Sequence, residues 1–366
     1  MPAKAAMRKP SDTSRSLPDA DDFAPSLLAW YDREGRNLPW RARWPELTDA
    51  YDVFLSELML QQTVVATVIP YFQRFKSLWP TIHDLAASDE ADLLREWAGL
   101  GYYARARNMH KAAKIIAGEF EGRFPDNEAE LVKLPGIGPY TAAAIIAFAF
   151  DKAAIVLDGN IERVMARYSA DDTPLPALKD KLRQIYPLLQ PSHRHSDFPQ
   201  AIMDLGARIC IPKAPRCEIC PLAKSCAVAG QPQAALLPVK PAKKAKPKRK
   251  GVIFIAQYDE KTLMIKRPDK GLLGGMMVFP TKGWFSSNDA LASIADAPFE
   301  GDWIELPQIV RHVFTHFELE LTIYHVALAD MPDISIIGDN SGGQWVSPDE
   351  VGLASVMKKV WQARPR

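Results

Sequence analysis

The chain of 366 residues carries a formal net charge of +1; 47% of its residues are hydrophobic, 24% are charged, and four are cysteines. These values are ordinary for a globular protein and exclude a disordered, collagen-like or disulfide-stapled chain. The N-terminal stretch lacks the apolar core of a signal peptide, and no apolar run is long enough to span a bilayer, so we expect a cytoplasmic protein without a membrane segment.

The length allows two or three domains, and the chain changes in character along its course. Residues 1–22 are rich in Lys, Ser, Asp and Pro, which predicts a flexible tail. From residue 23 to residue 230, apolar residues recur at helical spacing and prolines separate short segments, which predicts an all-α domain. Residues 231–250 are rich in Pro, Ala and Lys and predict an exposed linker. Its basic end, Lys240 to Lys250, would either attract a polyanion or keep the linker soluble.

The remaining residues, 251–366, predict a smaller α+β domain. Val252–Ala256 and Thr262–Ile265 predict two strands, which a turn at residues 258–261 would join into a hairpin. Glu318–Leu328 alternates between apolar and polar residues and predicts a further strand, and Asp349–Gln362 predicts a closing helix.

A carboxylate stands among apolar residues in the segment from Tyr51 to Thr63. Glu57 has Val53, Phe54 and Leu58 as neighbours, and burial among them would raise the pKa of its carboxyl group. A raised pKa suits a general acid that works near neutral pH. The alternative is a Glu on the solvated face of an amphipathic helix.

A glycine-rich turn, Leu134–Thr141 (LPGIGPYT), precedes an Ala-rich helical run. Gly136 and Gly138 would let backbone N–H groups approach a phosphate at the N-terminus of that helix. A plain connection between two helices explains the same pattern. Further along, Asp158 follows an apolar run and precedes a glycine, where a helix cap is the simpler interpretation.

The four cysteines lie close together, with the spacing C-x6-C-x2-C-x5-C from Cys210 to Cys226. Zinc sites usually place a dozen or more residues between two pairs of ligands. Four thiolates in one short loop instead favour a [4Fe-4S] cluster, with zinc or four ordinary cysteines as the alternatives. Lys213 and Arg216, inside the loop, would face either phosphates or solvent.

Three more motifs accompany these: SELMLQQT at residues 56–63, WAGLGYYARARN at residues 97–108 and LDGN at residues 157–160. All of the motifs follow one another in one particular order along the chain. In this combination the chain resembles the MutY-type adenine DNA glycosylases of the helix-hairpin-helix superfamily, strongly over residues 23–230 and more weakly over residues 251–366. The resemblance implies an all-α helix-hairpin-helix glycosylase domain with a [4Fe-4S] loop at residues 210–226. A smaller α+β Nudix-like domain would follow it.

The resemblance also implies an activity. The enzyme would be a hydrolase of base excision repair that flips adenine, mispaired with 8-oxoguanine or guanine, out of double-stranded DNA and cleaves its N-glycosidic bond. Glu57 would protonate adenine at N7, and Asp158 would stabilise the oxocarbenium-like sugar, in the manner of paired carboxylates in sugar hydrolases. Tyr140 and Asn160 would support the sugar and Asp158.

The remaining residues carried over from the family are expected to bind DNA or the cluster. The adenine pocket would contain Trp40, Arg41 and Leu60, and Gln62 would fill the gap in the base stack. Either Tyr102 or Tyr103 would stack beside 8-oxoguanine, and we expect it to be Tyr103. The clamp on the DNA backbone would comprise Gly136, Gly138 and Thr141. The residues that read 8-oxoguanine would be Phe314, Thr315 and His316. The cluster ligands would be Cys210, Cys217, Cys220 and Cys226.

Some positions distinguish the chain from related glycosylases, and others depart from the pattern of the family that it resembles. Glycosylases resembling endonuclease III carry at the position of Tyr140 a Lys that forms an imine and gives lyase activity; a Tyr cannot, so we expect a monofunctional enzyme that leaves an abasic site. No R-E-x-x-E-E run follows Gly275, so nucleotide pyrophosphatase activity is not expected. Thr315 replaces the Ser of the family's F-S-H loop, and the stretch from Ala42 to Asp49 is longer than usual.

Two other readings stay open at this point. One is a glycosylase for other mispairs or oxidised pyrimidines, and the other is a non-catalytic iron–sulfur protein that binds DNA or senses redox state. We expect a monomer in the cytoplasm, associated with the nucleoid. The sequence leaves open whether the cluster is structural or redox-active, and whether a sliding clamp is a partner.

Overall fold

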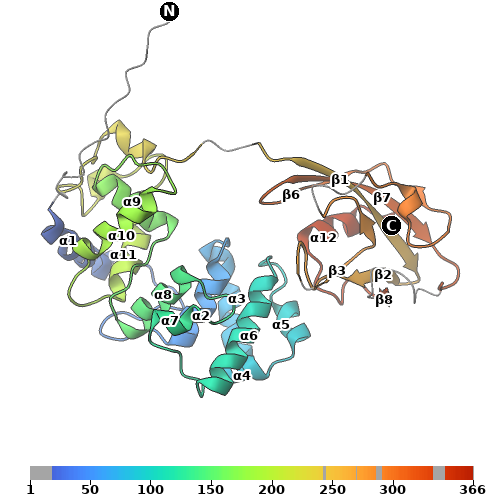
Figure 1. The fold of residues 1–366 in the computed structure, drawn as a ribbon, viewed down its shortest axis with the longest axis horizontal. Coiled ribbons are helices and arrows are strands. Elements are labelled where there is room, and N and C mark those ends of the chain that lie inside the picture. The colour runs from blue at the N-terminus through green and yellow to red at the C-terminus, as the bar shows by residue number, and fades with distance from the viewer. Residues whose placement is uncertain (1–18, 242–244, 269, 286–290, 333–342, 366) are drawn as a thin grey trace, which may run out of the picture. The chain divides into compact units, whose positions relative to one another are not determined.

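The structure, a computed structural model, describes residues 19–241, 245–268, 270–285, 291–332 and 343–365 (Figure 1). Residues 1–18 of the predicted tail therefore lie outside the described residues. Contacts divide the chain into two units. The first unit falls within Met1–Phe54, Asp126–Val132 and Ile137–Ala242, and the second within Leu55–Pro125, Lys133–Gly136 and Lys243–Arg366.

The first unit is helical. Its elements are α1 (Ala20–Glu34), the start of α2 (Ala50–Leu60), α7 (Glu128–Leu131), α8 (Pro139–Phe150), α9 (Gly159–Tyr168), α10 (Leu178–Leu189), α11 (Asp197–Arg208) and the 3-10 turns η1 (Cys217–Ile219) and η2 (Pro232–Leu236). Helix α1 packs against α10 and α11, and α9 packs against the same two helices. Their core is aromatic: the ring of Phe23 meets those of Tyr168 and Phe198 edge-on, at centroid distances of 4.7 and 5.9 Å.

The helical part of the second unit comprises the rest of α2, α3 (Val65–Leu78), α4 (Ile82–Ala87), α5 (Glu90–Glu96) and α6 (Ala104–Glu119). Helices α4 and α5 pack against α6. Side chains satisfy the free N–H groups at both short helices: Thr81 and Asp84 form a capping box on α4, and Asp89 caps α5. These caps keep helices of only one or two turns in place beside α6.

A mixed sheet forms the rest of the second unit (Figure 1). Its strands are β1 (Lys248–Tyr258), β2 (Lys261–Lys266), β3 (Met277–Val278), β4 (Thr281–Lys282), β5 (Ile304–Glu305), β6 (Val310–Val313), β7 (Glu318–Ala327) and β8 (Gln344–Val346), with η3 (Ile294–Asp296) and α12 (Ser355–Gln362) beside them. The main order is β3-β2-β1-β7-β5, in which β1 and β7 are parallel, while β4 pairs with β1, β6 with β7 and β8 with β2.

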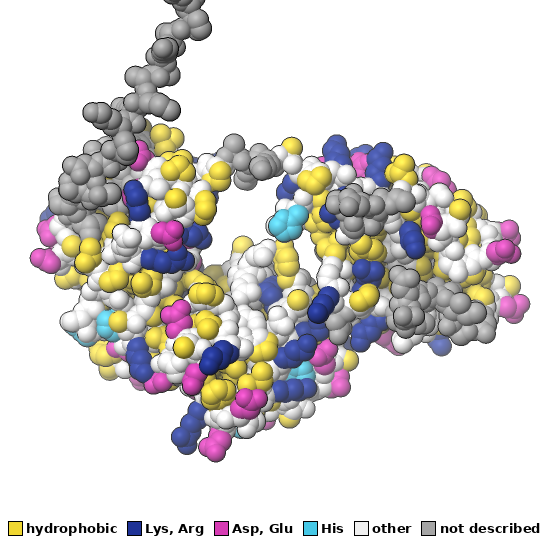
Figure 2. Space-filling model, in the orientation of Figure 1, with side chains coloured by type: hydrophobic (Ala, Val, Ile, Leu, Met, Phe, Trp, Pro, Cys, Tyr) yellow, Lys and Arg dark blue, Asp and Glu magenta, His cyan; other side chains and the backbone are white. Residues whose placement is uncertain are grey.

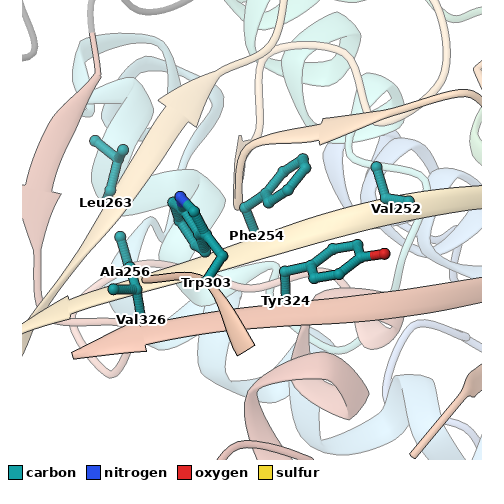
Figure 3. Close-up of a cluster of buried hydrophobic side chains, with 7 residues drawn as sticks. All are labelled: Val252, Phe254, Ala256, Leu263, Trp303, Tyr324 and Val326. Carbon is teal, nitrogen blue, oxygen red and sulfur yellow. The ribbon is translucent and has the colours of Figure 1, made fainter. Parts of the chain in front are cut away.

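Alternate residues of the central strands build the core on one face of the sheet (Figure 3). Phe254 of β1 lies in register with Tyr324 of β7, and their rings stack at 5.6 Å. Trp303 closes over Phe254 edge-on at 5.3 Å. The period of two places every second side chain on this face.

The predicted strands and the hairpin at residues 258–261 are confirmed, whereas three boundaries differ. Helix α1 begins at Ala20, inside the predicted tail, and α12 begins at Ser355, later than expected. Strand β1 begins at Lys248, inside the stretch predicted as linker. The start of that stretch also has structure, because Leu237 packs with Val228 and Ala234 in the first unit.

Charged side chains of both signs are interspersed over the face shown in Figure 2. Lys and Arg total 45 and Asp and Glu total 44, so the near-neutral sum comes from opposite charges that cancel rather than from a lack of charge. Within the described part of the chain, no helix has both the length and the apolar character needed to cross a bilayer.

Candidate functional site

Glu57 is buried in α2. Most residues of the helix are apolar, as expected for a helix in a protein core, and the Glu57 residue is only 7% exposed. Val53, Phe54 and Leu58 are buried around it along the helix. The alternative of a Glu on a solvated helix face is therefore wrong. The carboxyl group of Glu57 therefore lies inside the protein rather than in solvent.

The turn after α2 carries two further predicted residues. Leu60 is half-buried at the end of the helix. Gln62 is exposed and has a left-handed backbone conformation, with φ of 59°. A non-glycine residue in this region is uncommon and often marks a functional turn. This conformation directs the chain into a tight reversal between α2 and α3.

The two neighbouring tyrosines of the GLGYYARA segment have opposite environments. Tyr102 is 51% exposed, with φ of 48°, whereas Tyr103 is only 8% exposed. Burial raises the pKa of Tyr103 to about 12. The ring available for stacking is thus that of Tyr102, whereas we expected Tyr103.

The segment Phe314–His316 forms a tight turn between β6 and β7. The Phe314 N–H donates to the Phe317 carbonyl at 2.9 Å, and the two rings stack at 4.7 Å. Lys246 Nζ donates to the Phe314 carbonyl at 2.8 Å. Thr315 and His316 are exposed at the tip, and Thr315 Oγ1 lies 2.5 Å from the Tyr102 hydroxyl in the same unit.

Asp158 is the N-cap of α9. Its Oδ1 accepts from the N–H groups of Asn160 at 2.9 Å and Ile161 at 2.7 Å, and its Oδ2 accepts from Asn160 Nδ2 at 2.8 Å. The helix-cap interpretation is confirmed, and it does not compete with a catalytic one. Three donors hold a half-buried carboxylate in one orientation, next to the positive end of a helix dipole.

Arg163 joins this pair to the cysteine loop. Its Nη2 donates to Asn160 Oδ1 at 2.9 Å and to the Gly206 carbonyl at 2.6 Å, and its Nε donates to the Cys210 carbonyl at 2.8 Å. Burial lowers the pKa of Arg163. Arg167, one turn later, donates through Nη1 to the carbonyl and Sγ of Cys210 at 3.2 and 3.3 Å. No sequence motif marks these arginines, because most of their partners are carbonyls far along the chain.

Gly206 lets α11 lie close to α9. A Cβ at this position would meet Asn160 Cβ at 2.7 Å and Asn160 Cα at 3.2 Å. Packed interiors do not absorb such overlaps without moving a neighbour. The side chain of Asn160 thus keeps its place under Asp158 only because residue 206 has no side chain.

The cysteine loop forms one cavity of about 30 Å³ with all four cysteines in its lining. The four are free of disulfide bonds. Among the described residues, no three carboxylate, imidazole or thiol groups converge on a site for a single ion. Four thiols around a common cavity fit a cluster, which spreads its ligands over several metal atoms.

The segment between α1 and α2 holds two of the three residues predicted for the base pocket, Trp40 and Arg41. Trp40 is buried. Asp204, a fully buried residue on α11, accepts from Arg41 Nη1 at 2.9 Å and from Arg36 Nε at 2.8 Å. The Arg36 N–H also donates to Asp204, at 2.7 Å. Asp204 therefore fixes both arginines, and neither Asp204 nor Arg36 was singled out in the sequence.

The glycine-rich turn leads into α8. Gly136 has φ of 79°, and a Cβ there would meet Asn108 Cβ at 2.9 Å. Gly138 is the exposed N-cap of α8, with open space where a Cβ would stand. Tyr140 is half-buried, while Thr141 is buried, with only 2% of the residue exposed.

The predicted residues thus fall into two groups. Asp158, Asn160, Tyr140 and the cysteine loop belong to the first unit, where Arg163 connects the carboxylate to the loop. Glu57, Gln62, Tyr102 and Thr315 belong to the second unit, where Tyr102 meets Thr315.

Comparisons with known proteins cover both parts of the chain. Residues 55–186 match the HhH-GPD superfamily base excision DNA repair proteins, and residues 251–363 match the NUDIX domain. The chain is 34% identical over 343 residues to the adenine DNA glycosylase of Buchnera aphidicola subsp. Baizongia pistaciae (strain Bp), across 92% of this chain and 95% of that relative. It is 32% identical over 410 residues to the adenine DNA glycosylase of Homo sapiens, across 95% of this chain and 75% of that relative. A solved thermostable thymine-DNA glycosylase has a TM-score of 0.51 and 27% identity, over 57% of this chain and 95% of that one.

Proposed function

The chain belongs to the adenine DNA glycosylases of the HhH-GPD superfamily, enzymes of base excision repair, and we propose how its residues share the reaction. The single observation that supports the assignment of roles is the contrast between two carboxylates. Glu57 is buried in an apolar helix, whereas Asp158 accepts three hydrogen bonds at a helix N-terminus. The apolar surroundings of Glu57 match the role of a general acid, and the three donors around Asp158 match the role of a fixed electrostatic stabiliser.

In this proposal Glu57 donates its proton to N7 of a flipped adenine. The bond between C1′ and N9 then breaks, its electron pair goes to the base, and adenine leaves as a neutral molecule. Asp158 stabilises the positive charge on the sugar. Water adds to C1′, its proton returns to a carboxylate, and an abasic site remains. Tyr140 offers no amine for an imine, so the strand stays intact.

Recognition of the opposite base is the second part of the proposal. We assign stacking beside 8-oxoguanine to Tyr102 and a hydrogen bond with that base to Thr315. The close approach of the two hydroxyl groups, 2.5 Å apart, supports a shared task. His316, exposed beside Thr315, would face the same strand.

The Thr315→Ala variant tests this reader. We expect adenine release opposite 8-oxoguanine to slow by about tenfold, since one hydrogen bond is lost, while release opposite guanine changes little. Single-turnover rates on the two duplexes measure the ratio. The Thr315→Ser variant keeps the hydroxyl and should keep the preference. An unchanged ratio in Thr315→Ala would remove Thr315 from the reader.

We also propose that Cys210, Cys217, Cys220 and Cys226 hold a [4Fe-4S] cluster, supported by the common cavity that they line. When bound, the cluster would tie four points of the loop together and fix the carbonyl of Cys210 that Arg163 and Arg167 contact.

Metal analysis tests the cluster. The purified protein should contain about four iron atoms and four acid-labile sulfides per chain and absorb visible light. Cys217→Ser should lose iron and lower the melting temperature, because a ligand set is part of the folded structure. Stoichiometric zinc without sulfide would contradict the proposal.

Gly206→Ala tests the support of Asp158. The new methyl group would push Asn160 away and loosen its bond to Asp158, so we expect adenine release to slow by about tenfold to a hundredfold. Gly118→Ala is the matched control, since a Cβ on this glycine of α6 meets nothing within 4 Å. Equal rates for the two variants would mean that Asn160 does not position Asp158.

The non-catalytic alternative is not favoured. A DNA-binding sensor has no use for a buried acid and an oriented carboxylate, and the relatives named above are called glycosylases. The alternative of a glycosylase for oxidised pyrimidines is not favoured either, because this chain has Tyr140 where such enzymes use a Lys.

A further inference from the structure

Arg105, near the start of α6, is a buried cation with partners on three separate segments of the second unit. The residue is 8% exposed, and burial lowers its pKa to about 10. A buried guanidinium is costly unless its donors are satisfied. Here Nη1 and Nη2 donate to four backbone carbonyls and one hydroxyl.

The first segment is the C-terminal end of α2. Arg105 Nη1 donates to the carbonyls of Leu58 at 2.7 Å and Met59 at 3.0 Å, the two residues that directly follow Glu57. The last carbonyls of a helix have no partner within it, and they form the negative end of the helix dipole. Arg105 therefore fixes the end of the helix that carries the acid.

The second segment is the turn that carries Gln62. Arg105 Nη2 lies 3.4 Å from Thr63 Oγ1, one residue after the left-handed Gln62. Gln62 is the residue that we expect to fill the gap left by the flipped adenine. The same guanidinium thus contacts both the acid's helix and the turn beside it.

The third segment is the loop before Tyr102. Arg105 Nη2 donates to the carbonyls of Leu100 at 2.8 Å and Gly101 at 3.1 Å. The guanidinium also lies over the rings of Trp97 and Tyr102, at 5.2 and 5.7 Å from their centroids. Cations attract aromatic faces at these distances.

We propose that Arg105 is a positioning residue that makes the end of α2, the Gln62 turn and the Tyr102 loop move as one body. Through it, the base stacked on Tyr102 sets the position of Glu57, so that the rate of adenine release depends on the opposite base. This inference rests on the roles proposed above for Glu57, Gln62 and Tyr102. It differs from a simple helix cap, which would support all substrates alike.

A double-mutant cycle separates the two roles. Lys keeps the charge of Arg105 but not its planar fork, so Arg105→Lys cannot bridge three segments. Adenine release is measured under single-turnover conditions opposite 8-oxoguanine and opposite guanine, for Arg105→Lys, Tyr102→Ala and the double variant. We expect Arg105→Lys to lower the preference for 8-oxoguanine by about tenfold, and Tyr102→Ala to add little in that background, since coupled residues are not additive.

Other outcomes overturn the inference. Equal slowing on both duplexes, with the full effect of Tyr102→Ala kept in the Arg105→Lys background, would leave Arg105 a helix cap only. If Tyr102→Ala has no effect even in the unaltered protein, the proposed role of Tyr102 fails, and the inference fails with it. Exposed Arg95, paired with Asp92 on α5, supplies the control Arg95→Lys, for which no change is expected.

Thr63→Val keeps the test available if Arg105→Lys does not fold. The change is nearly isosteric and removes the Thr63 hydroxyl, which is one of the five acceptors of the guanidinium and also donates to the Gln61 carbonyl at 3.4 Å. A partial loss of preference, about twofold to threefold, is expected with the melting temperature almost unchanged. An unchanged preference in this variant would remove the Gln62 turn from the coupled body.

Discussion

Replacing Glu57 with Gln is expected to slow adenine release by about a thousandfold or more. Gln has nearly the same shape but carries no acidic proton, and a positioned general acid contributes about 10²- to 10⁴-fold. The rate is measured under single-turnover conditions on a duplex with adenine opposite 8-oxoguanine, and products are resolved with and without alkali.

The controls for this experiment are within the same chain. Glu119 is exposed on α6, and Glu119→Gln should keep the full rate. Strand breaks should appear only after alkali, because Tyr140 cannot form an imine. If Glu57→Gln keeps more than about a tenth of the activity, the acid must be another group.

Asp158→Asn is expected to slow adenine release by about a hundredfold while leaving the fold intact. Loss of an electrostatic stabiliser of the transition state costs about 10²- to 10³-fold. Asn is an N-cap about as good as Asp, so its oxygen can still accept from the N–H groups of Asn160 and Ile161. The variant thus removes the charge and keeps the two backbone bonds of the cap, while the bond from Asn160 Nδ2 loses its acceptor. Rates on the same duplex and melting temperatures measure the two effects separately.

Asp89 provides a matched control. It caps α5 through the same two backbone bonds, accepting from the N–H groups of Ala91 at 2.7 Å and Asp92 at 3.3 Å. Asp89→Asn should therefore change neither the rate nor the melting temperature. If Asp158→Asn lowers the melting temperature, and the rate falls only as far as this loss of stability explains, Asp158 is a helix cap and not a catalytic residue.

Local pattern was sufficient to predict some features and not others. The alternation of Glu318–Leu328 predicts β7, and the apolar neighbours of Glu57 predict its burial. In contrast, Tyr102 and Tyr103 are adjacent residues of one type, so no local pattern decides which is exposed. The left-handed backbone at Tyr102 decides it, and that conformation depends on the contacts of the loop.

The supporting residues were not predictable for a related reason. Arg105 and Arg163 donate mostly to backbone carbonyls, which every residue has, so their partners leave no trace in the amino-acid sequence. Gly206 resembles any glycine inside a helix until Asn160 is placed against it. Such roles follow from packing between distant segments.

The basic run shows how composition can mislead. Arg249, near its end, lies in β1, with its guanidinium 4.1 Å from the ring centroid of Phe317 and donating to the carbonyls of Trp284 and Phe285 at 3.1 and 3.0 Å. The positive charge of Arg249, expected to attract a polyanion or to keep an exposed linker soluble, is instead held against the turn that carries Thr315.

The parallel pairing of β1 with β7 has a consequence for biosynthesis. The register joins Lys248 to Glu318 and Gln257 to Ala327, so the central pair of the sheet cannot form until the ribosome has released Ala327. Contacts between residues so far apart in the chain form slowly. Until then the apolar strand β1 has an open edge, which is prone to aggregation. A chain terminated early within β7 would keep the helices that carry Glu57 and Asp158 but would leave this edge of β1 unpaired.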